Sequence, residues 1–236
     1  IEAETKRAID GLTFNVLEGQ SVGYVGPNGS GKTTTVKILT GILVPTSGEV
    51  HCGHYVPWRN RVRYQKHIGV VFGNRPQMTP ELTVVDHFAM LRLLYDVEKT
   101  RYRSQMDRLV GTMNIGPFLQ RPVRELSLGQ RMRCEIAAAF LHQPDIVFLD
   151  EPSIGIDAEA KRALRSLLRE LNHDFGTTLF LISHDARDIE ESCDRIIVIN
   201  DGKIVIDGDI KQVLRDRGGL KRATMRVSQI RTQDLM

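Results

Sequence analysis

The sequence predicts an α/β fold in which helices cover a mostly parallel β-sheet, with an antiparallel β region and an inserted helical segment. Short apolar runs alternate along the 236 residues with longer amphipathic stretches, as strands and helices do in such folds. A glycine-rich loop stands between one of these runs and a helical stretch. Hydrophobic residues make up 41% and charged residues 26% of the chain, which is usual for a protein with a buried core and argues against disorder.

The first elements are expected on either side of that loop. Residues 12–17 alternate apolar and polar side chains, which predicts an exposed antiparallel strand. Residues 21–25 form a compact strand, and a helix is expected over residues 32–39. Short β-branched or aromatic runs predict further buried strands at residues 68–72, 146–149, 178–182 and 196–199.

The stretch from Val84 to about residue 140 has an almost entirely helical pattern. Residues 82–86 open one expected helix, and two more are expected over residues 101–113 and 131–142. No serine- or glycine-rich linker and no repeat divides the chain. We therefore expect one domain over residues 1–236, with an α/β core at about 1–82 and 143–236 and a helical subdomain at about 83–142.

Composition excludes several classes of protein. The longest wholly apolar run, residues 136–141, is far shorter than a membrane span, so we do not expect the chain to cross a bilayer. The three cysteines lie far apart, which excludes a disulfide scaffold and a recognisable zinc site and fits a reducing cytosol. The net charge of +3 is too small to argue for nucleic-acid binding by itself. Residue 1 is Ile with no signal-peptide pattern after it, so we expect a processed, trimmed or partial product.

Basic residues are concentrated in two stretches of the chain. A solvated face or hairpin edge is the favoured interpretation, and contact with anionic lipid or nucleic acid is the alternative. The first stretch holds Arg59, Arg61, Arg63 and Lys66, and the second holds Arg215, Arg217, Lys221, Arg222, Arg226 and Arg231.

A phosphate-binding loop is predicted at residues 26–33. Its sequence, Gly26-Pro27-Asn28-Gly29-Ser30-Gly31-Lys32-Thr33, fits G-x-x-x-x-G-K-[ST] at every fixed position. Glycines let successive backbone amides point at an anion, and the following helix adds its positive N-terminal end. We expect Lys32 to contact the β- and γ-phosphates and the Thr33 hydroxyl to ligate magnesium. The competing interpretation is a glycine-rich turn that binds nothing.

Two carboxylates end the apolar run at residues 146–149. Ligands bind at the carboxyl ends of strands in open α/β sheets, which is where Asp150 and Glu151 are expected. Asp150 would hold magnesium directly or through water, and Glu151 would take a proton from an attacking water. The competing interpretation is that Asp150 only caps the next helix.

A Ser-x-Gly turn precedes the helix expected over residues 131–142. The segment is Leu126-Ser127-Leu128-Gly129-Gln130. Such a turn can bind an anion at a helix N-terminus, although a plain helix cap is the better interpretation of a single pentapeptide.

These motifs, in this order, resemble the nucleotide-binding subunit of ATP-binding-cassette (ABC) transporters over nearly the whole chain. Residues 126–157 and 188–195 look most like ATPases of the ABC-2 export type. The matching segments are Walker A at Gly26 to Thr34, the signature at 126–130, Walker B at 146–151, the D-loop at 153–157 and the switch His184 within 181–185.

The resemblance implies a P-loop NTPase of the ABC ATPase type, which binds ATP and Mg²⁺ and powers export through ATP-driven dimer closure. In this family two units pack head to tail, and each ATP lies between one unit's Walker A and the other's signature. Ser127, Gly129 and Gln130 would then face the partner's ATP, Asp157 would link the two sites, and His184 would sense the γ-phosphate. The implied partners are a second ATPase subunit, in a homodimer or a heterodimer, and membrane permease subunits at the cytoplasmic face of the membrane.

Two positions depart from the family pattern. The family carries a glutamine after the strand at 68–72 that touches magnesium and couples to the membrane partner. This chain has Gly73-Asn74-Arg75-Pro76-Gln77 there, so Asn74 is one candidate for the role and Gln77 is its rival. We expect the permease to contact residues 74–81 and the helical region after them.

No aromatic residue precedes Phe14, so the ring that stacks on adenine in the family was lost from the N-terminus, lies elsewhere or is absent.

Two other function classes are considered. The first is a soluble ABC-type ATPase that acts on nucleic acid or ribosomes. Such members usually carry two cassettes or long coiled coils, and this chain shows neither, so no nucleic-acid partner is expected. The second is a regulatory module that uses ATP without transport, and the presence of both Glu151 and His184 argues against an inactive binder.

Overall fold

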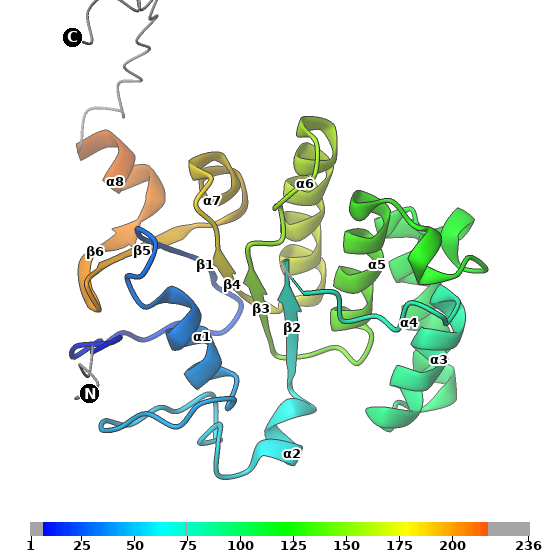
Figure 1. Ribbon diagram of the computed structural model, residues 1–236, viewed down its shortest axis with the longest axis horizontal. Coiled ribbons are helices and arrows are strands. Elements are labelled where there is room, and N and C mark those ends of the chain that lie inside the picture. Colours follow the sequence, from blue (N-terminus) through cyan, green and yellow to red (C-terminus); the bar gives the residue numbers. More distant parts are fainter. Residues whose placement is uncertain (1–6, 74, 217–236) are drawn as a thin grey trace, which may run out of the picture.

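The computed structural model describes residues 7–73 and 75–216, which form a six-stranded sheet with helices on both faces (Figure 1). The strand order is β2-β3-β4-β1-β5-β6, and all neighbouring strands are parallel except β5 and β6. The predicted α/β class, with a mostly parallel sheet and an antiparallel β region, is confirmed. The strands are β1 (Ser21–Val25), β2 (Ile68–Phe72), β3 (Ile146–Asp150), β4 (Thr178–Ile182), β5 (Arg195–Asn200) and β6 (Lys203–Asp209).

The helices fall into three groups by their position in the chain. The first group, α1 (Lys32–Leu39) and the short α2 (Arg61–Gln65), lies between β1 and β2. Between β2 and β3 lie α3 (Val84–Leu94), α4 (Lys99–Met113) and α5 (Leu128–Phe140), with single 3-10 turns at Gly116–Phe118 and Val123–Glu125. The last group is α6 (Ala158–Phe175), α7 (Ala186–Ser192) and α8 (Ile210–Asp216).

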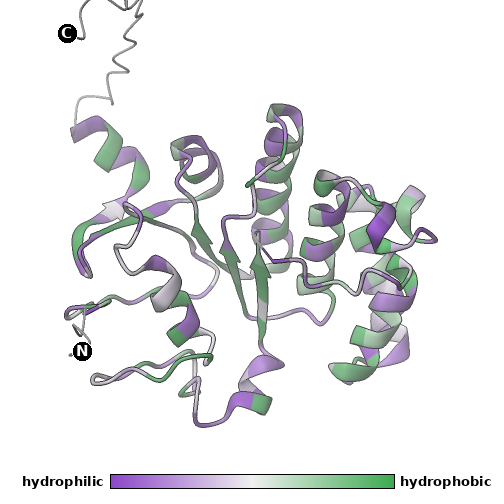
Figure 2. Cartoon of the chain, viewed as in Figure 1, coloured by the Kyte–Doolittle hydropathy of each residue, from purple (hydrophilic) through white to green (hydrophobic). Residues whose placement is uncertain are grey.

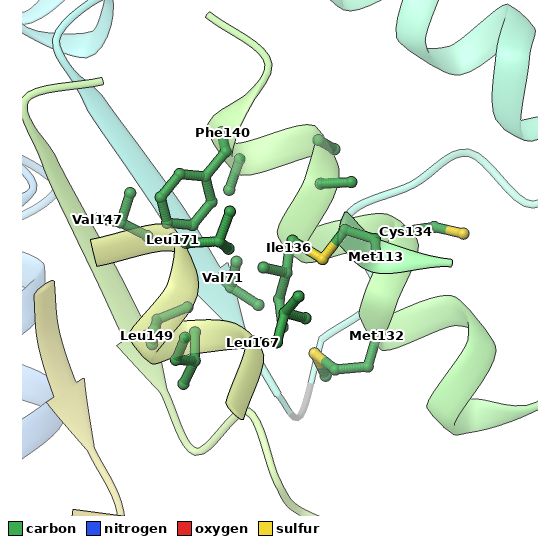
Figure 3. Close-up of a cluster of buried hydrophobic side chains, with 14 of the residues drawn as sticks. Val71, Met113, Met132, Cys134, Ile136, Phe140, Val147, Leu149, Leu167 and Leu171 are labelled. Atoms are coloured by element: carbon green, nitrogen blue, oxygen red, sulfur yellow. The ribbon is translucent and has the colours of Figure 1, made fainter. Parts of the chain in front are cut away.

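Alternate side chains of the central strands enter two separate cores. Val147 and Leu149 of β3 point into the larger core, which α5 and α6 cover, whereas Phe148 points into a smaller core beside Val36 of α1. This division follows from the period of two in a β-strand, and it explains why the buried strands are apolar at every position. Figure 3 shows the larger core, and Figure 2 shows the central strands as hydrophobic segments, whereas the helices around them mix hydrophilic and hydrophobic residues.

Helix α6 shows how the sequence builds one of these layers. Its buried leucines, Leu164, Leu167, Leu168 and Leu171, recur at the spacing of a single helix face. Asp157 caps its first turn, because a side-chain oxygen of Asp157 accepts the Ala160 amide at 2.8 Å. Gly176 ends the helix in the left-handed conformation that favours glycine.

The helical insertion predicted after β2 lies at one side of the sheet (Figure 1). Thr83 caps α3 by accepting the Asp86 amide at 3.2 Å. The helix expected over residues 101–113 begins two residues earlier, and the one expected over 131–142 spans Leu128–Phe140. Gly129 and Gln130 therefore belong to the first turn of α5, because Ser127 is its cap. The division into one domain with a helical subdomain stays a prediction.

The antiparallel strand predicted at residues 12–17 is wrong, since this segment is not a strand. Its alternation reflects burial on one side only: Leu12, Phe14 and Val16 pack against the smaller core without strand pairing. The antiparallel partner of β5 is instead β6, which was missed because its side chains are only partly buried. The signal that could have found β6 is the Asp201-Gly202 turn, with φ angles of +45° and +73°, which is typical of a tight hairpin.

The structure places the cysteines, the most apolar helices and part of the two basic stretches. All three cysteines are buried and free of disulfides. Within residues 7–73 and 75–216, no helix is both long and apolar enough to cross a membrane. The basic side chains at residues 59, 61, 63 and 66 are exposed on and around α2, and so is Arg215, whereas the rest of the basic tail lies outside the described residues.

We expect replacement of Ile136 by Ala to lower the free energy of unfolding by about 2–5 kcal/mol, because this fully buried side chain lies between α5 and the sheet (Figure 3). Chemical denaturation of the purified chain measures the change. Val62→Ala is the control: Val62 is 77% exposed on α2, and its truncation should change stability by less than about 0.5 kcal/mol. Equal effects of the two substitutions would contradict the assignment of the core.

Candidate functional site

Parallel pairing brings three loops to one edge of the sheet. Strands β3, β4 and β1 are neighbours, and their register aligns Asp150 with Ile182 and Ile182 with Tyr24. The segments after these strands therefore start side by side, although they are far apart in the sequence (Figure 1). They are the predicted phosphate loop after β1, Glu151 after β3, and His184 after β4.

The predicted phosphate loop turns directly into α1. Gly31 is the N-cap of α1 with φ +105°, a left-handed conformation that strongly favours glycine. A Cβ at this position would also lie 2.5 Å from the carbonyl oxygen of Ala8, so the N-terminal segment closes against the loop. The result is a loop whose backbone leads into a helix N-terminus, the arrangement that binds anions.

Lys32 lies at the start of α1 with its side chain folded over the loop. Its Nζ donates to the carbonyl oxygens of Gly26 at 2.7 Å and Pro27 at 3.0 Å, and only 9% of the residue is exposed. The next residue, Thr33, is exposed and faces a cavity that both carboxylates also line. The predicted loop thus concentrates a positive charge and a hydroxyl group at one point.

Asp150 is a buried carboxylate at the end of β3. Burial raises its pKa above the ordinary value, and the neighbouring Glu151 carboxylate raises it further, while the charges of Lys32 and Lys37 act in the opposite direction. A carboxylate that is desolvated in this way gains from a bound cation, because the cation replaces the lost solvation. Asp150 does not cap a helix, so the competing interpretation from the sequence is wrong.

Glu151 and His184 lie opposite each other. Glu151 Oε2 is 2.8 Å from His184 Nδ1, and the Glu151 side chain is 16% exposed while that of His184 is 64% exposed. The contact lacks the alignment of a hydrogen bond, since Glu151 Oε2 has no hydrogen-bond partner among the described residues. Glu151 also has φ +55°, an uncommon value for a residue with a side chain. Strained backbone of this kind clusters at functional sites.

These groups line a cavity of about 620 Å³. Its wall includes most of the predicted phosphate loop, Thr34, both carboxylates and His184. Two further lining residues, Ala8 and Ile154, were not predicted from the sequence. Ala8 lies in a loop without a motif, and Ile154 lies in the D-loop segment 153–157 but was not itself assigned a role, so only the folded chain places these two apolar residues at the site.

The predicted signature segment does not line this cavity. Ser127 and Gln130 form a capping box at the start of α5, in which Ser127 Oγ accepts the Gln130 amide at 3.3 Å and Gln130 Oε1 accepts the Ser127 amide at 3.1 Å. The segment does contact the loop after β3, because a Cβ at Gly155 would lie 2.7 Å from Leu128 Cδ2. Helix capping, the plainer interpretation, is therefore present, and Asp157 similarly caps α6.

Of the two candidates for the coupling glutamine, Asn74 lies outside the described residues. Gln77 is exposed, does not line the cavity and donates its backbone amide to Glu135 Oε1 at 3.3 Å. Phe14 packs against Tyr24 and Phe180 in the smaller core, so it is not free to stack on a base.

A family model described as ABC transporter matches residues 9–154, which include the phosphate loop and both carboxylates. This chain belongs to the ABC transporter family. Among curated ABC relatives, it is 33% identical over 203 residues to the Nod factor export ATP-binding protein I of Ralstonia nicotianae, covering 85% of this chain and 62% of that protein. It is 34% identical over 210 residues to a putative ABC transporter ATP-binding protein of Methanopyrus kandleri, covering 89% of this chain and 78% of that protein.

Solved ABC structures confirm the fold. One is the ATP-binding cassette MJ0796, a dimer in a post-hydrolysis state bound to ADP and Pi, with a TM-score of 0.77, 25% identity and coverage of 89% of this chain and 94% of that one. Another is cbiO1 from Clostridium perfringens, part of the transporter complex cbiONQ, with a TM-score of 0.80, 26% identity and coverage of 89% and 85%. This chain spans less than two thirds of the length of the Ralstonia protein.

We expect Asp150→Asn to raise the free energy of unfolding of the metal-free ABC chain at pH 7, because it removes a charge that is desolvated in the folded state. The pKa of Asp150 is higher in the folded chain than in the unfolded chain. Ionised Asp150 therefore lowers stability only at pH values at which the unfolded chain has lost this proton. The gain should therefore shrink as the pH falls through the raised folded value toward the ordinary 3.8. Urea denaturation at several pH values measures it. Glu81→Gln, at an exposed carboxylate, is the control, and an equal or larger gain there would contradict desolvation as the cause.

Proposed function

We propose that this chain is the ATP-binding and ATP-hydrolysing subunit of an ABC transporter, and that it powers export of a substrate through ATP-driven closure of a dimer. The observation that carries the proposal is the single cavity in which the phosphate loop, Asp150, Glu151 and His184 meet. Membership of the ABC family supports the same chemistry, and relatives named for export support the direction of transport.

In this proposal Gly26, Pro27, Asn28, Gly29, Ser30, Gly31, Lys32, Thr33 and Thr34 bind the phosphates of ATP. Lys32 Nζ already donates to two loop carbonyls, and its charge lies where the β- and γ-phosphates would enter. Charge-assisted hydrogen bonds of an ammonium group to phosphate oxygens are stronger than those to neutral carbonyls. An incoming phosphate would therefore draw Lys32 away from at least one of its present acceptors.

Thr33 and Asp150 fit a magnesium ion. Both present oxygen atoms to the same cavity, and Mg²⁺ prefers oxygen ligands and uses few protein groups when phosphates supply the rest. The raised pKa of buried Asp150 marks a carboxylate for which a bound cation would be favourable. When bound, Mg²⁺ supplies charge neutralisation for the phosphate oxygens.

Glu151 is proposed to take the proton from the attacking water, and His184 to contact the γ-phosphate. Glu151 is largely shielded from solvent and its Oε2 lacks a hydrogen-bond partner among the described residues, so this oxygen is available to accept a proton. His184 is the more exposed member of the pair and lines the cavity, so a ligand could reach its ring.

Dimerisation would complete the site. Ser127, Gly129 and Gln130 lie at the N-terminal end of α5 but outside the cavity of their own chain, which fits a role toward the ATP of a second subunit. The exposed Asp157 would link the two sites. ATP that contacts both subunits favours the closed dimer, and hydrolysis removes that bridge and shifts the population back. The dimeric structure of the similar cassette MJ0796 supports this arrangement.

A permease contact is proposed on α3 and the loop before it, residues 74–81, in which Asn74 or Gln77 would couple the contact to the site. Met90, Leu93 and Leu94 form an apolar surface on α3, and Leu93 and Leu94 are 69% and 67% exposed. Exposed apolar side chains that lie together mark protein or membrane contacts. This contact would hold the chain at the cytoplasmic face of the membrane.

The alternative of a soluble ATPase acting on nucleic acid or ribosomes gains no support. The Ralstonia relative is named an export ATP-binding protein, and the Methanopyrus relative is named a putative ABC transporter ATP-binding protein.

We expect Glu151→Gln to lower the rate of ATP hydrolysis at least about a hundredfold, because the amide cannot accept the proton from water. ATP binding should remain within about threefold of wild type, and the variant should accumulate as an ATP-bound dimer. A steady-state phosphate-release assay, with size-exclusion chromatography in ATP, measures these outcomes. Glu159→Gln, at an exposed carboxylate in the first turn of α6, should retain normal hydrolysis. Near-normal hydrolysis by Glu151→Gln would remove Glu151 from its proposed role.

We expect the tagged native-length protein to copurify with a multi-span membrane protein in stoichiometric amount when it is solubilised from membranes with detergent. Mass spectrometry identifies the partner. Substituting both Leu93 and Leu94 with Asp should abolish recovery of the partner while the purified chain remains folded. Val62→Asp, at a similarly exposed apolar residue on α2, should leave recovery unchanged. Recovery only from the soluble fraction, with ribosomes or nucleic acid, would overturn the transport proposal.

A further inference from the structure

We infer that Asp188 on α7 is a positioning residue that holds the loops after β3 and β4 together and thereby keeps Glu151 and His184 opposed. The inference rests on the proposed ATPase function for its consequence, but its structural basis is a separate cluster of buried polar side chains. Asp188 is 3% exposed and does not line the cavity.

One carboxylate oxygen of Asp188 connects the two loops. Its Oδ2 accepts a hydrogen bond from the hydroxyl of Ser183, at 3.1 Å, and another from the hydroxyl of Ser153. Ser183 directly precedes His184, and Ser153 follows Glu151 by two residues. Both serines are buried, so water is a poor competitor for these bonds. A shift of Asp188 would therefore be transmitted to both loops.

The other oxygen of Asp188 is held by Arg165 of α6. Arg165 Nη1 donates to Asp188 Oδ1 at 2.9 Å, and Nε of the same guanidinium donates to Glu191 Oε2 at 2.9 Å. A planar guanidinium fixes the directions of its donors, so it fastens α7 to α6 in one orientation. Asp188 consequently has little freedom to move relative to the leucine-rich face of α6 in the larger core.

The Glu151–His184 pair needs such external support. Although its atoms are 2.8 Å apart, the contact lacks hydrogen-bond alignment and cannot set the orientation of the two side chains by itself. The backbone fixes the start of one loop, because the Glu151 amide donates to the Ile182 carbonyl at 2.9 Å. Ser183 Oγ also accepts the Asp185 amide at 3.0 Å, so this serine fixes the backbone on both sides of His184.

Single substitutions of the two serines give the sharpest test. Ser153→Ala should speed amide hydrogen exchange in residues 153–157, and Ser183→Ala in residues 183–185, with exchange in the phosphate loop unchanged. Each variant should lower kcat for ATP hydrolysis about tenfold, because small misplacement of catalytic groups is costly, while KM and the Kd for ATP change less than about twofold. The control is Ser192→Ala, which removes a buried hydroxyl on α7 that lacks a partner among the described residues, and it should change none of these quantities.

Asp188→Asn should speed amide hydrogen exchange in both loops at once. This measurement does not require the chain to hydrolyse ATP. Unchanged exchange in both loops in that variant, or unchanged kcat in both serine variants, would overturn the positioning role. A loss of folding in Asp188→Asn, shown by circular dichroism, leaves the decision to the serine variants. If the wild-type chain hydrolyses no ATP, the proposed function fails, and the exchange pattern alone then decides whether Asp188 holds the loops.

Discussion

The parallel register of β1, β4 and β3 is the constraint on which the site depends. Parallel strands end at the same edge, so pairing Asp150 with Ile182 and Ile182 with Tyr24 brings three loops together. The hydrogen bonds of the sheet set this alignment, and the two cores on either face keep it rigid. A shift of one strand by a single residue would move each of its side chains from one core into the other, where the close packing does not fit it, so the register is strongly specified.

Two buried carboxylates, Asp150 and Asp188, lie near this edge of the sheet, and their charges are balanced in different ways. Asp150 lacks an ion-pair partner among the described residues, and burial raises its pKa, which suits a group that would hold a cation. Asp188 is also buried, but it is paired with Arg165 and accepts hydrogen bonds from two serine hydroxyls. The first arrangement keeps a carboxylate available for a ligand, whereas the second uses one to hold structure. The two carboxylates therefore differ in their surroundings: Asp188 is paired and hydrogen-bonded, whereas Asp150 has no ion-pair partner among the described residues.

The segments expected to act between subunits are also structural within one chain. Ser127 and Gln130 cap α5, and Asp157 caps α6. Capping does not exclude a contact with a second subunit, because the helix N-terminus still presents backbone amides to solvent. Leu128, in the first turn of α5, also lies close to the loop that follows Glu151, because a Cβ at Gly155 would lie 2.7 Å from Leu128 Cδ2.

The sequence by itself determined the features that depend on neighbouring residues. The G-x-x-x-x-G-K-[ST] loop, the apolar strands and the acidic pair at the end of β3 each combine a local pattern with a local structural cause, and the structure contains all of them. Only the tertiary structure decided the strand order, the place of β6, the approach of Ala8 and Ile154 to the cavity, and the joining of Ser153, Ser183 and Arg165 by Asp188. The physical reason is that strand pairing and buried polar contacts form between residues far apart in the chain, and the energy of such contacts leaves no periodic pattern in the sequence. The segment at residues 12–17 shows the same limit, because its alternation recorded which side chains are buried but not whether its backbone pairs with another strand.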